Sequence, residues 1–241
     1  MRTRIFGVFA KAGLSLIGAG FILLAACGAP GTQASATSSK GSTVTETTTP
    51  IVQAGAPVLR ARAQEVPKER ITTPEFQALV TRMIDAMRRA PGVGLAAPQI
   101  DVGLRVFVLE DRPELASRLS PAELAERERS PFPVRVIVNP EVTAIGDQKA
   151  TFFEGCLSVN GYAALVERSL EVEVTGLDEH AAPVRWRVRG WPARILQHEM
   201  DHLNGTLYVD RMMTRSFMTG DQAKARFAGK PIAEIRATLG L

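Results

Sequence analysis

Aromatic residues make up only 6% of this 241-residue sequence, and no run of lysine and arginine is interleaved with them. That scarcity argues against a nucleic-acid-binding surface, although the formal net charge is +4. Part of the basic excess lies in residues 1–27, which hold Arg2, Arg4 and Lys11 and no acidic residue. Without this segment, 26 basic residues face 25 acidic ones. The remainder is nearly neutral, so its charge gives no reason to expect a nucleic-acid partner.

The sequence also lacks a hydrophobic run long enough to span a bilayer comfortably. Its apolar stretch near the start, residues 12–26, is short and leads into Leu24-Ala25-Ala26-Cys27. This tetrapeptide resembles the lipobox at which bacterial lipoprotein precursors are cleaved and acylated. We therefore interpret residues 1–27 as a lipoprotein-type signal peptide and expect Cys27 to carry a lipid. A leader cleaved elsewhere, or an uncleaved anchor, is the alternative.

Residues 28–50 contain few large side chains. Glycine, alanine, serine, threonine and proline occupy 19 of the 23 positions, a composition that buries too little apolar area to offset chain entropy. Treated as a flexible coil, this segment has an r.m.s. span of roughly 25–30 Å. We expect a disordered tether here, followed by a single domain in residues 51–241, in which no internal repeat is visible.

The patterns within that domain predict an α+β fold. Thr73-Pro74-Glu75 is a typical helix start, and apolar residues then recur at helical spacing as far as Met87. A second, short surface helix is predicted after Ser120 by its capping pattern. The runs that favour strands are residues 106–109, 134–138, 170–175 and 184–188. Together these runs indicate a mixed, largely antiparallel sheet.

The most informative segment is residues 190–205, in which Asn204-Gly205 can end a helix. His198 and His202 are four residues apart, so they lie on one helical face, with Glu199 beside them. This H-E-x-x-H pattern is typical of metal-dependent hydrolases. A surface helix with unrelated histidines is the alternative, but two of the three histidines in the chain occur here.

A catalytic metal site usually has a third protein ligand and an open position for water. The candidates for that ligand are Cys156, His180, Asp210 and Glu234. We favour Cys156, because Gly155 permits close backbone approach and a thiolate is a strong ligand for zinc or ferrous iron. If Cys27 is acylated, Cys156 has no disulfide partner within the chain. It is then either a metal ligand or an inert buried thiol.

Three motifs together resemble the signature motifs of peptide deformylases. They are Gly92-Val93-Gly94-Leu95-Ala96-Ala97-Pro98-Gln99, Glu154-Gly155-Cys156-Leu157-Ser158 and Gln197-His198-Glu199-Met200-Asp201-His202-Leu203. The resemblance covers about residues 58–217 and is strongest to the mitochondrial and plant organelle-type members. Many bacterial members have proline and arginine where this chain has Asn160 and Ala163.

The resemblance implies a catalytic domain whose sheet packs around a central metal-binding helix. Cys156, His198 and His202 would hold one divalent ion, with ferrous iron expected first and zinc as the alternative. Glu199 would be the general base. The same resemblance implies that Glu154 pairs with Arg168 and braces the metal loop.

The implied reaction is hydrolysis of a formyl-methionyl peptide or protein to formate and a free N-terminal methionine, a step of protein biosynthesis. Gln99 and the backbone N–H of Leu157 would hold the oxyanion, and Gly94 and Gly155 would bind the substrate backbone. The expected walls of the methionine pocket are Val93, Trp191 and Ile195. An exported metallopeptidase and a non-catalytic metal-binding lipoprotein are the competing functions.

Leader and chemistry point to different compartments. Formylated nascent chains emerge in the cytoplasm, whereas the motif at Cys27 predicts export. The next methionine after Met1 is Met83, inside the first expected helix, so a start there would truncate the fold. We expect a membrane-anchored lipoprotein whose domain lies outside the cytoplasm. A cytoplasmic enzyme, if the encoded leader is not used, is the alternative.

Overall fold

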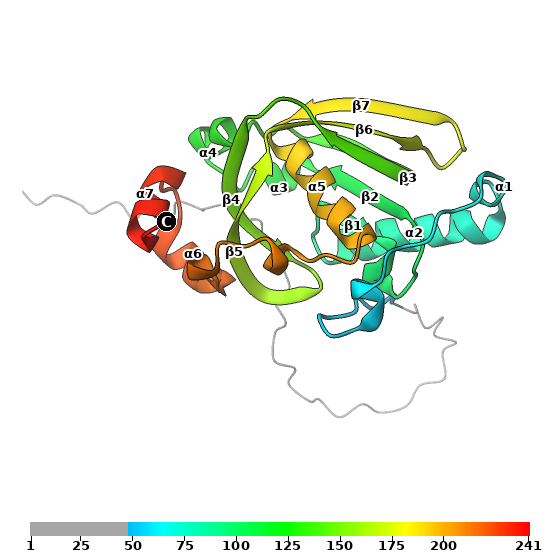
Figure 1. Cartoon of the computed structure of the whole chain (residues 1–241), viewed down its shortest axis with the longest axis horizontal. Coiled ribbons are helices and arrows are strands. Elements are labelled where there is room, and N and C mark those ends of the chain that lie inside the picture. The colour runs from blue at the N-terminus through cyan, green and yellow to red at the C-terminus, as the bar shows by residue number, and fades with distance from the viewer. Residues whose placement is uncertain (1–47) are drawn as a thin grey trace, which may run out of the picture.

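One helix, α5 (Trp191–Leu203), lies at the centre of the fold, with the strands of two sheets on either side of it (Figure 1). The computed structural model describes residues 48–241. Its strands are β1 (Gly94–Ala96), β2 (Val106–Asp111), β3 (Phe132–Ala144), β4 (Lys149–Cys156), β5 (Val159–Ser169), β6 (Glu171–Leu177), β7 (Pro183–Arg189) and β8 (Met218–Thr219). Its other α-helices are α1 (Lys68–Ile71), α2 (Pro74–Arg89), α3 (Pro113–Ala116), α4 (Pro121–Glu126), α6 (Gly220–Phe227) and α7 (Ile232–Leu239). Its short 3-10 helices are η1 (Pro57–Arg60), η2 (Ala97–Ile100), η3 (Tyr208–Asp210) and η4 (Thr214–Ser216).

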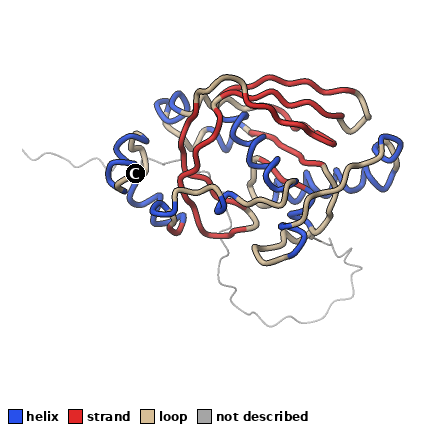
Figure 2. The backbone as a smooth tube through the Cα atoms, viewed as in Figure 1, coloured by secondary structure: helices blue, strands red, loops and turns tan. Residues whose placement is uncertain are grey.

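The strands form a five-stranded sheet in the order β1-β2-β3-β6-β7 and a three-stranded sheet in the order β4-β5-β8. Every pairing within these sheets is antiparallel, and Figure 2 shows the two groups of strands on opposite sides of α5. A single parallel bridge joins Gln64 to Leu104 outside the named strands. The predicted α+β class is confirmed, and the sheets are more uniformly antiparallel than expected.

The helix starts predicted at Thr73 and Ser120 are confirmed by the capping hydrogen bonds in the structure. At α2, the Thr73 hydroxyl accepts a hydrogen bond from the Phe76 N–H at 3.4 Å, and Pro74 occupies the first turn. At α4, Ser120 and Glu123 form a reciprocal capping box. All four predicted strand segments are confirmed as β2, β3, β6 and β7, although β6 begins one residue later than predicted. The β4–β5 hairpin was not predicted.

Helix α5 is buried on nearly every side, which is unusual for a helix rich in charged residues. Its apolar residues, including Leu196 and Leu203, belong to the main hydrophobic core. Its buried polar residues need partners inside the protein, because an unpaired buried charge is costly. At its end, Gly205 adopts φ +72°, and a side chain there would overlap the backbone carbonyl of Arg60. The helix therefore stops where the sequence predicted and turns sharply away.

A smaller core lies on the far side of the three-stranded sheet, where α6 and α7 cover β4 and β5 (Figure 1). Its buried members include Phe153, Leu165 and Phe227. Phe153 on β4 therefore faces this second core, whereas Cys156 at the end of the same strand faces the main core.

Residues 1–27, including Cys27, and most of the predicted tether lie outside the described residues. Within residues 48–241, no helix combines the length and the hydrophobicity needed to cross a bilayer.

Candidate metal centre

Two elements far apart in the sequence meet at one buried point. Strand β4 ends at Cys156, and α5 presents His198 and His202 one turn apart. One ligand atom from each residue lies within 4.8 Å of the others, and all three side chains are buried. The Cys156 Sγ is 3.3 Å from the His202 Nε2. The β4–β5 ladder has a register shift between Gly155 and Cys156, a local irregularity at the residue that carries the thiol.

His198 has one ring nitrogen, Nε2, free to bind a metal ion. The Nδ1–H of His198 donates to the Glu154 Oε2 at 2.9 Å, which leaves the Nε2 lone pair available. That Nε2 is buried, and it has no hydrogen-bond partner in residues 48–241. A thiol and two imidazoles around a buried point form a set of donors that suits zinc or ferrous iron. The residues present therefore fit a divalent metal ion.

Glu199 is buried beside these three residues, with one carboxylate oxygen unpaired among the described residues. Burial raises the pKa of Glu199 to about 7, because the charged form is poorly solvated there. A pKa near neutrality suits a group that accepts and returns a proton. Gly94 lies directly against this carboxylate, and a Cβ at position 94 would overlap it. A side chain at position 94 would therefore push the Glu199 carboxylate away from this place.

Gln99 reaches the same site from the 3-10 turn η2. Its Oε1 accepts a hydrogen bond from the Ala96 N–H at 2.9 Å, which orients the amide. Its Nε2 lies 3.5 Å from the Cys156 Sγ and 3.3 Å from the Ser158 Oγ. The backbone N–H of Ser158 also approaches the thiol, at 3.4 Å. Two N–H donors, from the Gln99 side chain and the Ser158 backbone, therefore lie near the Cys156 sulfur.

Behind His198 lies a buried cluster of charged side chains. The expected pair of Glu154 and Arg168 is confirmed, with hydrogen bonds of 3.0 and 2.9 Å. Arg194 and Asp201 complete the cluster, by bonds to Glu154 and Arg168 respectively. Burial opposes ionisation of Glu154, yet the charges of Arg168 and Arg194 and the hydrogen bonds from His198 and Arg168 hold its pKa well below the ordinary value. Sequence reasoning missed the roles of Arg194 and Asp201, which resemble ordinary charged helix residues.

The other candidate ligands lie elsewhere. His180 is an exposed residue in the turn between β6 and β7, 3.8 Å from the Glu179 carboxylate. Asp210 is bound by Arg60 and by the Leu207 N–H. Glu234 lies on α7 and pairs with a lysine one turn away. In the part of the chain that the structure describes, none of these belongs to the Cys156 group.

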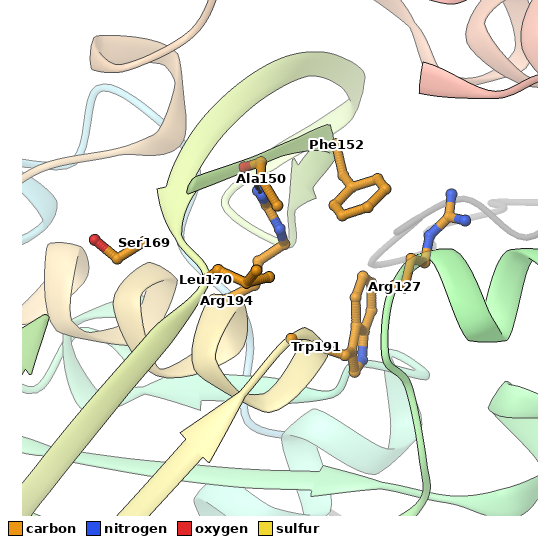
Figure 3. A pocket seen from close by; sticks show the side chains of 8 residues that line it. Arg127, Ala150, Phe152, Ser169, Leu170, Trp191 and Arg194 are labelled. Carbon is orange, nitrogen blue, oxygen red and sulfur yellow. Dashed lines mark hydrogen bonds between the residues drawn. The ribbon is translucent and has the colours of Figure 1, made fainter. Parts of the chain in front are cut away.

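The residues expected around the methionine pocket, Val93, Trp191 and Ile195, are all buried. Trp191, Phe152 and Arg194 border a small cavity (Figure 3). None of the candidate metal ligands borders that cavity. Val93 and Ile195 are core residues that do not line this cavity. Phe152, which the sequence reasoning did not single out, lies opposite Trp191.

The fold and the site define a class: an α+β protein with a buried cysteine and two histidines around one point and a carboxylate beside them, the arrangement of metal-dependent hydrolases. The comparisons narrow this class. The chain belongs to the polypeptide deformylase family, whose model matches residues 48–217.

The chain is 52% identical over 169 residues to the chloroplastic peptide deformylase 1A of Solanum lycopersicum, a match covering 70% of this chain and 61% of that protein. It is 44% identical over 167 residues to the mitochondrial peptide deformylase of Homo sapiens, covering 69% of each. Organelle-type members are thus among its relatives. The chain spans less than two thirds of the tomato relative's length.

Among solved structures, the Met-Ala-Ser-bound class I type b peptide deformylase of Acinetobacter baumannii superposes with a TM-score of 0.61 and 33% identity. The match covers 68% of this chain and 97% of that one. The shared fold therefore comprises nearly the whole of the bacterial protein.

The geometry predicts which side chains bind metal. We expect His198→Ala, His202→Ala and Cys156→Ala each to lose most bound metal, because two remaining donors hold an ion poorly. His180→Ala, the matched control, should retain wild-type metal content. Elemental analysis of the four purified variants measures this. Loss of metal in His180→Ala together with full occupancy in Cys156→Ala would contradict the assignment.

Proposed function

We propose that this protein is a peptide deformylase, which hydrolyses the N-formyl group of formyl-methionyl peptides to formate and a free amine. The observation that supports this most directly is the convergence of Cys156, His198 and His202 beside the buried Glu199. The family membership supports the same reaction, since the three motifs that form the site all lie within the matched residues.

In this proposal Cys156, His198 and His202 would hold one divalent ion, and the chemistry it would supply is a lowered pKa of water near neutrality. Glu199 accepts a proton from the attacking water and later passes it to the leaving amine, a role that matches its pKa of about 7. Gln99 Nε2 and the backbone N–H of Leu157 stabilise the negative charge that develops on the formyl oxygen. The hydrogen bond from Ala96 to the Gln99 Oε1 keeps the amide N–H directed toward the ligand cysteine.

The peptide backbone has a natural partner in β1. This strand is at the edge of the five-stranded sheet, so an extended chain can add to it through backbone hydrogen bonds. Gly94 on β1 and Gly155 on β4 are the proposed backbone contacts, and Trp191, Val93 and Ile195 the proposed surroundings of the methionine side chain. The Acinetobacter relative was solved with Met-Ala-Ser, a peptide that begins with methionine, which supports this substrate class.

The proposed base gives the first activity test. We expect Glu199→Gln to fold and to keep its metal but to release formate from formyl-Met-Ala at least about a hundredfold more slowly, because the amide cannot accept the proton. Formate release and metal content should be measured on the same preparations. Turnover within about tenfold of the wild type would rule out this role.

The same assay separates the competing functions. Cleavage of an internal peptide bond, without formate release, would indicate a metallopeptidase. Metal binding with neither reaction would indicate a non-catalytic metal-binding protein. Formate release from wild-type protein alone supports the deformylase.

We further propose ferrous iron as the native ion, with zinc as the alternative, because the donor set contains one thiolate and two imidazoles. Protein purified anaerobically with iron should lose activity in air, since ferrous iron and the Cys156 thiolate both offer oxidation routes. The measurement is activity in air and under argon beside elemental analysis. Equal activity in both, with iron shown to be bound, would contradict the proposal.

The final part of the proposal concerns location. The sequence Leu24-Ala25-Ala26-Cys27, followed by the predicted tether of residues 28–50, supports a lipoprotein anchored at Cys27 with its domain outside the cytoplasm. Native protein should then fractionate with membranes and carry lipid on Cys27, whereas Cys27→Ala should not. Mass spectrometry of the mature N-terminus checks this. A soluble cytoplasmic enzyme that begins between residues 40 and 60 would show that the encoded leader is not used.

A further inference from the structure

Glu154 receives more hydrogen bonds than the expected pair with Arg168 supplies. Its Oε1 accepts from the Arg168 Nε at 3.0 Å and from the Arg194 Nη1 at 2.6 Å. Its Oε2 accepts from the Arg168 Nη2 at 2.9 Å and from the His198 Nδ1 at 2.9 Å. Each carboxylate oxygen thus accepts two hydrogen bonds. The carboxylate cannot rotate without breaking hydrogen bonds to its arginine and histidine partners.

Arg194 is the member of this set that links the carboxylate to the metal-binding helix itself. It precedes His198 by four residues on α5, so both side chains leave the same helical face. Its guanidinium is held in turn by the Val166 carbonyl on β5 at 3.1 Å and the Ala150 carbonyl on β4 at 2.6 Å. The planar fork therefore contacts both strands of the hairpin and Glu154 at once.

The surroundings leave the guanidinium little freedom. It lies over the Phe152 ring, 5.2 Å from the ring centroid, and forms one wall of the cavity that Trp191 also borders (Figure 3). Its side chain is only 4% exposed. A buried arginine with this many fixed acceptors holds its partner in a defined plane.

We propose that Arg194 is a positioning residue of the metal centre: it fixes the Glu154 carboxylate, which in turn holds the His198 ring with Nε2 directed at Cys156 and His202. The inference rests on the metal centre of the proposed function. The hydrogen bond that Arg194 donates goes to Glu154 and not to a candidate metal ligand, so Arg194 acts on His198 through Glu154. Groups that orient a histidine ligand in this way typically change metal affinity by about 10- to 100-fold.

A matched control separates this role from simple structural stabilisation. Arg129 is equally buried, at 5% exposure, and it donates two hydrogen bonds of 2.7 Å to the buried Asp111. It also lies over an aromatic ring, 4.5 Å from that of Trp191. Its carboxylate partner is Asp111 on β2, whereas Arg194 binds the carboxylate that orients His198. Arg129→Met therefore removes a comparable buried ion pair that does not include Glu154.

The experiment compares cobalt-loaded wild type, Arg194→Met and Arg129→Met. We expect Arg194→Met to release cobalt to a chelator about 10- to 100-fold faster and to show altered cobalt absorption bands. Arg129→Met should lose thermal stability but keep the wild-type spectrum and release rate. If Arg194→Met matches Arg129→Met in both cobalt measurements, Arg194 is only a structural ion-pair partner and the proposal is wrong.

Arg194→Lys keeps the inference testable if Arg194→Met fails to fold. Lysine retains the charge but cannot hold Glu154 and two carbonyls in one plane. The cobalt release rate of Arg194→Lys should therefore lie between those of wild type and Arg194→Met. If only Arg194→Lys folds, its release rate should exceed that of wild type. A wild-type spectrum and rate in Arg194→Lys would overturn the proposed positioning. None of these readouts needs turnover. Wild type that binds cobalt but releases no formate would refute the proposed activity while leaving the test of Arg194 intact.

Discussion

The Glu154 carboxylate is the group on which the arrangement of the centre depends. It is buried at the end of β4, where an unpaired charge would be strongly destabilising. Its charge is compensated by hydrogen bonds from Arg168 on β5 and from Arg194 and His198 on α5. Breaking one such buried pair typically costs about 3–5 kcal/mol. Separation of the β4–β5 hairpin from α5 would therefore be strongly destabilising. The same contacts that join these elements also orient a candidate metal ligand.

Two buried glutamates on the two sides of His198 show how local partners decide protonation. Glu154 has cations on both oxygens, so its pKa lies well below the ordinary value. Glu199 is as deeply buried but has an unpaired oxygen among the described residues, and its pKa rises to about 7. Burial penalises the charge of both carboxylates, and for Glu154 the neighbouring guanidinium groups and the hydrogen bond from His198 outweigh that penalty. Glu154 therefore stays ionised near neutral pH, whereas Glu199 is able to exchange protons there.

The cluster extends outward from the centre along α5. Asp201 accepts from Arg168 at 2.5 Å and from Arg211 at 2.7 Å, so it links the buried guanidinium to one near the surface. The helix thus carries Arg194, His198 and Asp201 on the side that faces the β4–β5 hairpin. On the neighbouring part of the helix, Glu199 faces β1 at Gly94. Each side of α5 has its own partner, which explains why nearly the whole helix is buried.

Consecutive residues alone determined the helices at Thr73 and Ser120, the H-E-x-x-H face of α5 and the strands β2, β3, β6 and β7, because capping and periodicity are local properties. The β4–β5 hairpin escaped prediction, since its inward faces serve two different cores and its burial pattern does not alternate simply. The sequence favoured Cys156 over His180 as the third residue of the group, and the tertiary structure brings Cys156 beside the two histidines. Only the tertiary structure gave Arg194 a partner 40 residues away. Such pairings depend on how β4 packs against α5, and local spacing carries no information about that contact.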